Sequence, residues 1–202
     1  MTFPLLRFPA CAAAVAALFI FSAPATYAAD VDPALTDVVS LVSQRLAIAE
    51  PIAHWKWVHH EQILDKARQQ QGLANITARA QSAGVDPAFA RAFFRDQLDE
   101  STETQRALFA RWQQVPPTGA TVDPKTVSRP ERDRLTQLLI VALVRLQPLR
   151  AMPDCPLRVK QGLSSWKLMP TFDVSRSDAM RIALSHICVN DETSPAESPE
   201  SR

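Results

Sequence analysis

The sequence predicts an almost entirely helical protein. It contains only four glycines and no Asn-Gly or Asp-Gly pair of the kind that closes a tight β-hairpin. Its β-branched residues fall in short runs, whereas long segments are rich in Ala, Leu, Gln and Arg, which favour helix. We therefore expect an all-α, single-domain bundle of about six helices.

Aspartates and prolines predict where these helices begin. Asp32, Asp65 and Asp86 can accept hydrogen bonds from the free N–H groups of a first helical turn, and a proline follows two of them directly. The expected helices begin near residue 33, run from 65 to about 83, from 87 to about 113, and from 128 to before Pro148, and occupy 156–168 and 174–189. A proline-rich linker is expected over 115–127.

Pro51 falls inside the first helical pattern. Proline lacks the backbone N–H that a helix interior needs, and its ring crowds the preceding turn. We expect the helix to kink near Ala47 or to split there.

The two ends of the chain are expected to lie outside the folded domain. Arg7 is the only charged residue before Asp30, and an apolar run is followed by small residues near Ala28. This pattern predicts a secretory signal peptide over 1–28, with an uncleaved membrane anchor as the alternative. Residues 29–190 then form the domain. Residues 191–202 are polar and rich in Pro, Ser and Glu, which predicts a disordered tail.

The charge balance excludes a general affinity for polyanions. The chain has 22 Lys and Arg against 21 Asp and Glu, and loss of Arg7 with the signal peptide leaves 21 of each. A neutral chain has no broad electrostatic attraction for nucleic acid or a membrane surface. Any cationic site must therefore be local.

Cysteine usage fits an exported protein. Two cysteines, Cys155 and Cys188, follow the signal peptide, and in an exported chain that number suggests one disulfide. The alternative is a pair of buried thiols. No third or fourth ligand lies at zinc-like spacing, so no metal site is expected.

Two polar stripes interrupt helix faces that are otherwise apolar. The first polar stripe is Arg45 and Lys56, which are 11 residues apart and so point in nearly the same direction. The second polar stripe is Gln97, Ser101 and Gln105, spaced four residues apart. Long cations and amides on an inward face are costly unless a partner satisfies them. A small anionic ligand would do so; the alternatives are side chains reaching solvent or neighbouring helices.

The order and spacing of several motifs resemble the exported (gamma) subclass of the type II, all-helical chorismate mutases. The resemblance covers about residues 35–190. Its motifs are Gln44-Arg45-Leu46, Glu50-Pro51-Ile52-Ala53, Trp55-Lys56-Trp57, Asp65-Lys66-Ala67-Arg68, Phe94-Arg95-Asp96-Gln97, Ser101 with Gln105, and Ser128-Arg129, and the Cys155/Cys188 pair matches the disulfide of exported members. Each motif is weak alone, and the ordered set is strong.

The resemblance implies a reaction and roles for the polar residues. The family rearranges chorismate, a dianion, to prephenate in an intramolecular Claisen reaction that needs no cofactor or covalent bond. Arg45, Arg68 and Arg129 resemble its carboxylate-binding arginines. Lys56 and Gln105 resemble the catalytic pair beside the ether oxygen. Asp65 resembles the acceptor for the substrate hydroxyl, and Ser101 a further polar contact. A homodimer, with each pocket inside one protomer, is also implied.

Two other kinds of protein remain open from the residues themselves. One is a non-catalytic periplasmic helical protein that binds a small carboxylate ligand. The other is a structural bundle whose polar stripes pair with partner helices. Lys56 with Gln105 favours the enzyme, because a carboxylate receptor has no need of donors at an ether oxygen.

Overall fold

A computed structural model describes residues 32–170 and 172–189. The expected signal peptide (1–28) and tail (191–202) lie outside these residues. The helices are α1 (Pro33–Ala47), α2 (Ala49–Val58), α3 (Lys66–Ser82), α4 (Pro87–Trp112), α5 (Ser128–Arg150), α6 (Cys155–Trp166) and α7 (Ser177–Ala183), with a 3-10 turn η1 (Val174–Arg176) before α7. The described residues contain no strand, so the all-α prediction is confirmed.

The predicted helix starts are confirmed by their caps. The Asp32 carboxylate accepts from the Ala34 N–H at 2.8 Å, and Pro33 opens α1. Asp65 and Asp86 cap α3 and α4 in the same way, each accepting from the N–H three residues later. These side chains satisfy amide groups that a helix start leaves free.

Pro51 splits the first helix as expected. α1 ends at Ala47 and α2 begins at Ala49, so the break falls one turn before the proline. Pro51 has no N–H to donate to the Ala47 carbonyl, which removes the hydrogen bond that would join the two helices. If α1 and α2 are counted as one broken helix, the described residues form six helices, the number expected.

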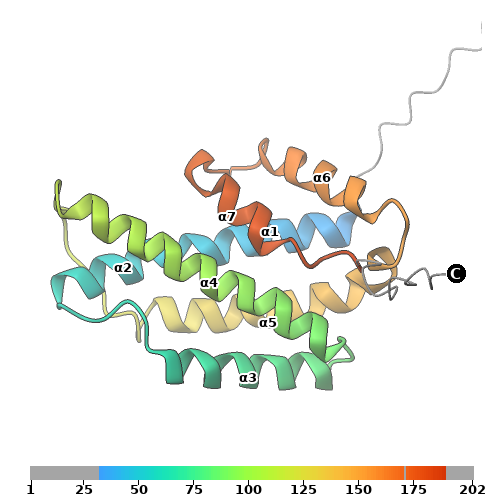
Figure 1. Cartoon of the computed structure of the whole chain (residues 1–202), viewed down its shortest axis with the longest axis horizontal. Coiled ribbons are helices and arrows are strands. Elements are labelled where there is room, and N and C mark those ends of the chain that lie inside the picture. The colour runs from blue at the N-terminus through green and yellow to red at the C-terminus, as the bar shows by residue number, and fades with distance from the viewer. Residues whose placement is uncertain (1–31, 171, 190–202) are drawn as a thin grey trace, which may run out of the picture. The chain divides into compact units, whose positions relative to one another are not determined.

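Two helices organise the packing (Figure 1). α1 packs against α5, α6 and α7, while α4 crosses the bundle and packs against α2, α3 and α7. Fully buried side chains from these helices form the main core, among them Val38, Val42, Phe93, Phe94, Leu139 and Leu143. A second cluster of Ala53, Leu108 and Trp112, with Trp57 and Phe109 against it, fixes α2 on α4.

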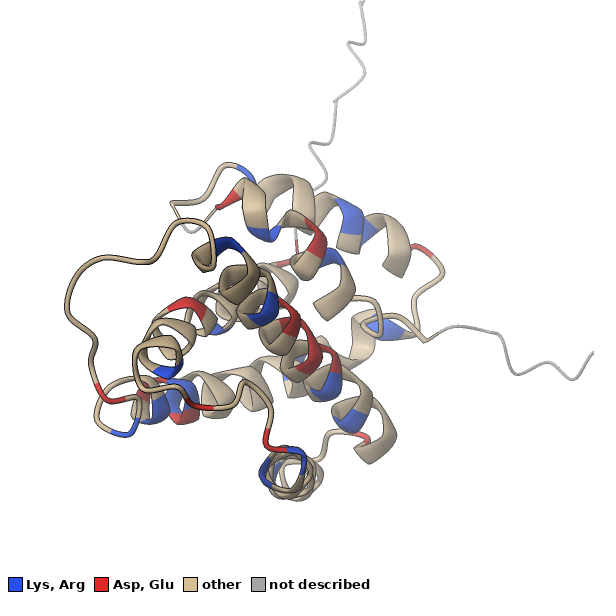
Figure 2. Ribbon diagram, turned by 60° about the vertical axis from the view of Figure 1, so that its left-hand side comes forward, with Lys and Arg blue, Asp and Glu red and all other residues tan. Residues whose placement is uncertain are grey.

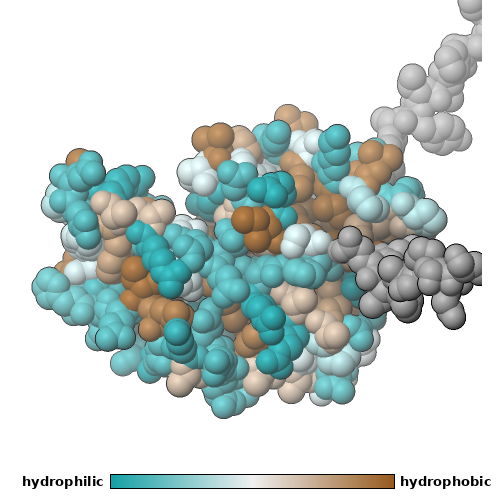
Figure 3. Space-filling model, viewed as in Figure 1, coloured by the Kyte–Doolittle hydropathy of each residue, from teal (hydrophilic) through white to brown (hydrophobic). Residues whose placement is uncertain are grey.

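The surface agrees with a neutral chain. Basic and acidic residues are interspersed along the helices in Figure 2. The face shown in Figure 3 is mainly hydrophilic, with apolar side chains in small groups. Among the described residues, no helix has the length and apolar character needed to cross a membrane.

The expectation that α5 ends before Pro148 is wrong. The helix continues to Arg150, with Pro148 inside its last turn. Leu149 is buried, the Arg150 side chain donates to the Ile187 carbonyl at 2.8 Å, and the Val189 N–H donates to the Arg150 carbonyl at 3.0 Å. Tertiary contacts therefore stabilise a turn that proline disfavours locally.

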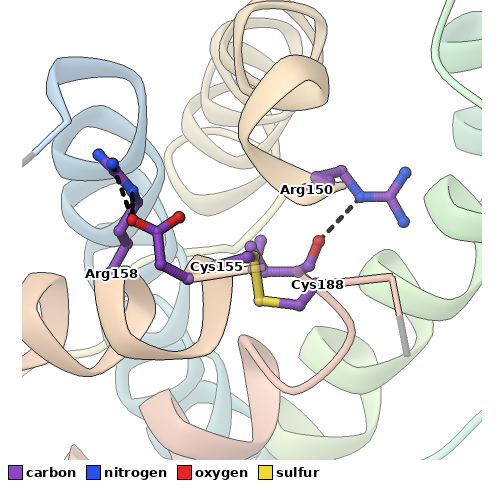
Figure 4. Close-up of a disulfide and its surroundings, with 6 residues drawn as sticks. Arg150, Cys155, Arg158 and Cys188 are labelled. Carbon is purple, nitrogen blue, oxygen red and sulfur yellow. Dashed lines mark hydrogen bonds and ion pairs between the residues drawn. A yellow bond between two sulfur atoms is a disulfide. The ribbon is translucent and has the colours of Figure 1, made fainter. Parts of the chain in front are cut away.

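The predicted helix over 174–189 is too long. It begins as the turn η1 and is helical only to Ala183. Beyond it, the chain turns so that Ile187 enters the core and Cys188 forms a disulfide with Cys155 (Figure 4). The disulfide prediction is confirmed, and the alternative of two free thiols is excluded.

Candidate functional site

The predicted site residues come from five segments: the end of α1, α2, the start of α3, the second half of α4 and the start of α5. In Figure 1 these segments lie in the left half of the bundle. α2 packs on α4, and α1 packs along α5, so side chains from different segments can meet between them.

Arg45 lies inside the bundle. Its side chain donates from Nη1 to the Thr136 hydroxyl at 2.5 Å and to the Arg132 carbonyl at 3.4 Å, and its guanidinium lies 5.7 Å from the centre of the Phe94 ring. Only 6% of the residue is exposed, which excludes the alternative in which Arg45 reaches solvent. Burial, and then the positive charge of Arg132, lower the Arg45 pKa to about 10.

Lys56 and Gln105 meet directly. The Lys56 ammonium donates to Gln105 Oε1 at 3.0 Å and to the Ile63 carbonyl at 2.6 Å. Gln105 is 5% exposed, and its Nε2 donates to the Ser101 carbonyl at 3.1 Å. The two polar stripes therefore converge, although they are 49 residues apart in the chain.

The donors of this pair are only partly used. An ammonium has three N–H groups, and Lys56 uses two of them on Ile63 and Gln105. The Gln105 amide has two N–H groups, and its Nε2 donates to the Ser101 carbonyl at 3.1 Å and, in a long contact, to the Ser101 hydroxyl at 3.4 Å. Lys56 therefore has one donor left for a bound acceptor atom, and Gln105 can offer one by giving up its long contact with the Ser101 hydroxyl.

Lys56 also titrates more easily than an exposed lysine. Burial, followed by the positive charge of Arg132, lowers the pKa of Lys56, and Arg68 lowers it further. These cations repel one another in a partly buried setting, so a bound anion would be stabilising.

The other two residues of the second polar stripe, Ser101 and Gln97, are partly or fully buried. Ser101 is half-buried, and its hydroxyl lies 3.4 Å from Gln105 Nε2. Gln97 is 1% exposed and donates to the Phe93 carbonyl of its own helix at 3.3 Å. Its Oε1 is buried without a hydrogen-bond partner among the described residues. A buried acceptor of this kind is unusual in a folded protein.

Asp65 and Arg68 lie at the edge of the site. Arg68 Nε is 3.5 Å from Asp65 Oδ2, and the two side chains are 77% and 56% exposed. Asp65 can orient Arg68, yet neither side chain is enclosed by the helices. Their nearness to Lys56 shows in the effect of Arg68 on the Lys56 pKa.

Arg129 is exposed at the start of α5. Its backbone N–H donates to the Pro124 carbonyl at 2.7 Å, which fixes this end of the linker on the helix. The side chain has no ion pair within the described part of the chain, and its charge lowers the pKa of Arg132, one turn further along.

Sequence reasoning missed Arg132. The positive charge of Arg132 lowers the pKa of Arg45 and of Lys56. The charge of Arg129 in turn lowers the pKa of Arg132. The signal was available: Ser128, Arg132 and Thr136 repeat the four-residue spacing of the second polar stripe. Ser128 and Thr136 are both buried, so Arg132 shares their inward face.

A Ser-His-Asp group elsewhere has the wrong arrangement for nucleophilic catalysis. Ser185 and His186 both contact Asp96 Oδ2, at 3.2 and 2.5 Å, and Ser185 approaches the same ring nitrogen of His186 that contacts the carboxylate. A catalytic triad uses the two ring nitrogens separately. This group joins the end of α7 to α4.

The comparisons with known proteins agree on one family. The family model for chorismate mutase type II matches residues 32–106. The chain is 28% identical to the secreted chorismate mutase of Mycolicibacterium smegmatis over 176 residues, which are 87% of this chain and 97% of that protein. The solved chorismate mutase from Burkholderia thailandensis is 49% identical, with a TM-score of 0.74 over 78% of this chain and 100% of its own. The chorismate mutase from Burkholderia phymatum is 28% identical, with a TM-score of 0.73 over 78% of this chain and 97% of its own.

Proposed function

Because the chain belongs to the chorismate mutase family, we propose that it converts chorismate to prephenate by an intramolecular Claisen rearrangement. The reaction needs no covalent intermediate, proton transfer or cofactor. The protein would hold the chair-like conformer of the substrate and stabilise the negative charge that grows on its ether oxygen.

The contact between Lys56 and Gln105 carries this proposal. The Lys56 ammonium on α2 and the Gln105 amide on α4 lie in contact, and both carry N–H groups, which suits an ether oxygen that becomes more negative in the transition state. Because neither group has to lose or gain a proton, both act as fixed donors.

The remaining polar residues have proposed roles in substrate binding. Arg45, Arg68 and Arg129 bind the two carboxylates, since a guanidinium can donate two parallel hydrogen bonds to one carboxylate. Asp65 accepts from the substrate hydroxyl, and Ser101 makes a polar contact to a carboxylate. Arg45 supports this assignment best, because it is buried and has no acidic partner within 4 Å among the described residues.

We also propose that residues 1–28 direct export to the periplasm or beyond and that the exported protein is a homodimer. The secreted relative from M. smegmatis supports export. Exposed apolar residues of α5, Leu138 and Val141, offer surface for subunit contact. N-terminal sequencing of exported protein and light scattering of the purified protein test these two statements.

The activity is tested by adding purified protein to chorismate and following the ultraviolet absorbance of the substrate. Rapid loss with formation of prephenate supports the proposal. Saturable binding of chorismate without loss would instead indicate the non-catalytic carboxylate-binding protein, and neither loss nor binding would indicate the structural bundle.

A further inference from the structure

Arg132 lies on the face of α5 that points into the bundle. Ser128 and Thr136, four residues before and after it, are 7% and 1% exposed. Residues four apart lie on one side of a helix, so the Arg132 side chain leaves the helix toward the same interior. The residue is half-buried, in contrast to Arg129 and Arg134, which are exposed.

The turn of α5 that carries Arg132 also positions Arg45. Arg45 Nη1 donates to the Arg132 carbonyl and to the Thr136 hydroxyl, and that hydroxyl donates to the same carbonyl at 2.7 Å. Part of the Arg45 fork is therefore occupied by α5. Arg45 has fewer donors left for a carboxylate than a free arginine has.

No carboxylate neutralises Arg132. Within the described ranges, no Asp or Glu oxygen lies within 4 Å of its side chain, whereas its neighbour Arg134 is paired with Glu131 at 2.7 Å. Burial lowers the pKa of Arg132, Asp133 raises it, and Arg129 lowers it by a smaller amount. Arg132 in turn lowers the pKa of Arg45 and of Lys56, so these cations are close enough to repel one another. Like charges held together away from water require an anion to be stable.

We propose that Arg132 binds a carboxylate of the substrate beside Arg45, as a further substrate-binding residue contributed by α5. This inference rests on the proposed function, because the anion it names is the chorismate dianion. A carboxylate carries its full charge in both the ground state and the transition state. Arg132 therefore contributes mainly to substrate affinity, and its loss raises KM more than it lowers kcat.

The test compares Arg132→Ala with Arg132→Lys and with Arg134→Ala as the matched control. Arg134 is on the same helix, is exposed and is paired with Glu131. Loss of a hydrogen bond between charged groups predicts an increase in KM of about 10- to 100-fold for Arg132→Ala, with kcat within about threefold. Arg132→Lys is expected to recover part of the affinity, and Arg134→Ala to keep the KM of the wild type.

Thermal unfolding separates binding from a structural role. Without ligand, Arg132→Ala is expected to unfold at the same temperature as the wild type or higher, because a repelling charge is removed. Prephenate, itself a dicarboxylate, is expected to raise the unfolding temperature of the wild type more than that of the variant. A lower unfolding temperature with reduced kcat and unchanged KM would overturn the proposal, as would wild-type KM in Arg132→Ala.

These outcomes are distinct from failure of the proposed function. If the wild-type protein does not consume chorismate, the assigned activity is wrong, whatever the variants do. If the wild type is active and Arg132→Ala has the same KM and the same response to prephenate, only the role of Arg132 is wrong.

Discussion

At the scale of single residues, Gln105 decides how the proposed activity depends on acid. A Glu at this position would have to be protonated before its carboxyl group could donate a hydrogen bond. The Gln105 amide donates at any pH, and its Oε1 already accepts from Lys56. We therefore expect the wild type to be active near neutral pH.

Gln105→Glu is expected to confine activity to acidic pH. An ionised Glu at this position would form an ion pair with the Lys56 ammonium. Its negative charge would also repel the charge that develops on the ether oxygen. The measurement is kcat/KM between pH 4.5 and 8 for the wild type, Gln105→Glu and the exposed control Gln113→Glu. Activity of the wild type only below pH 5 would contradict this role of Gln105. A Gln105→Glu variant with the same dependence of kcat/KM on pH as the wild type would also contradict it.

The lowered pKa of Lys56 predicts a loss of activity at alkaline pH. Burial and the neighbouring Arg132 lower the Lys56 pKa below that of an ordinary lysine. Lys56 therefore loses its proton at a lower pH than an exposed lysine would, and the site then loses one hydrogen-bond donor. The value of kcat/KM should fall as pH rises through this lowered pKa. Bound dianion favours the ammonium, so kcat should fall at a higher pH than kcat/KM does. Constant kcat/KM to beyond pH about 10.4, the ordinary lysine value, would refute the assignment.

At the scale of helices, local signals predicted most boundaries. Asp32, Asp65 and Asp86 were identified as caps because short acidic side chains before a helical pattern have few other local roles. Pro51 was identified as a break because a missing N–H acts within one turn. Such signals depend only on neighbouring residues, which the sequence displays.

The boundaries that were wrong depend on distant contacts. α5 continues past Pro148 because Arg150 is held by Ile187 and Val189, 37 and 39 residues further along. α7 ends early because Cys188 must reach Cys155. The sequence does not show which distant backbone groups form hydrogen bonds, or where the chain turns back on the bundle. A prediction from proline or from periodicity uses neighbouring residues alone, so it cannot include these contacts.

The candidate site, like the helix boundaries, could be predicted only in part from the sequence. Arg45, Lys56 and Gln105 stand out in the sequence because polar groups on an apolar helix face are unusual. The structure buries Arg45 and brings Lys56 into contact with Gln105. The exposure of Arg68 and Arg129 depends on how helix starts sit in the bundle, which spacing alone does not determine. Arg132 was missed because its stripe lies on a helix where many charged residues are exposed.

The Cys155–Cys188 disulfide is expected to contribute strongly to stability. It closes a loop with a sequence separation of 33 residues and tethers the end of the α7 segment to the start of α6. Restricting the unfolded chain in this way stabilises a fold by about 3–4 kcal/mol in the chain-entropy model. Cys155→Ser with Cys188→Ser should therefore lower the free energy of unfolding by about that amount.

Urea unfolding with and without a thiol reductant measures this effect. Reduction should destabilise the wild type and leave the double variant unchanged, since the variant has no bond to break. Equal stability of the wild type and the double variant under oxidising conditions would show that the packing of α7 on α1 and α4 suffices.

At the scale of the whole molecule, the chain is close to neutral and yet holds unpaired cations at one partly buried site. Seven of the described arginines are paired with an acid within 4 Å, such as Arg145 with Asp37 and Arg158 with Asp154. Other cations, such as Arg79 and Lys167, have no ion pair among the described residues and are exposed to water. Arg45, Lys56 and Arg132, on α1, α2 and α5, have no ion pair among the described residues, and Arg132 lowers the pKa of the other two. The fold thus maintains a local site for a dianion without a general affinity for polyanions.

The most direct test of the central claim is chorismate turnover by Lys56→Ala beside the wild type and Lys160→Ala, whose lysine is exposed on α6. The wild type and Lys160→Ala should both convert chorismate to prephenate. Lys56→Ala should lose nearly all turnover while it keeps a helical circular dichroism spectrum and a cooperative thermal transition, because it lacks the donor at the ether oxygen but retains the core. Near-normal turnover in a folded Lys56→Ala protein would contradict the role of Lys56, and no turnover by the wild type would contradict the proposed activity.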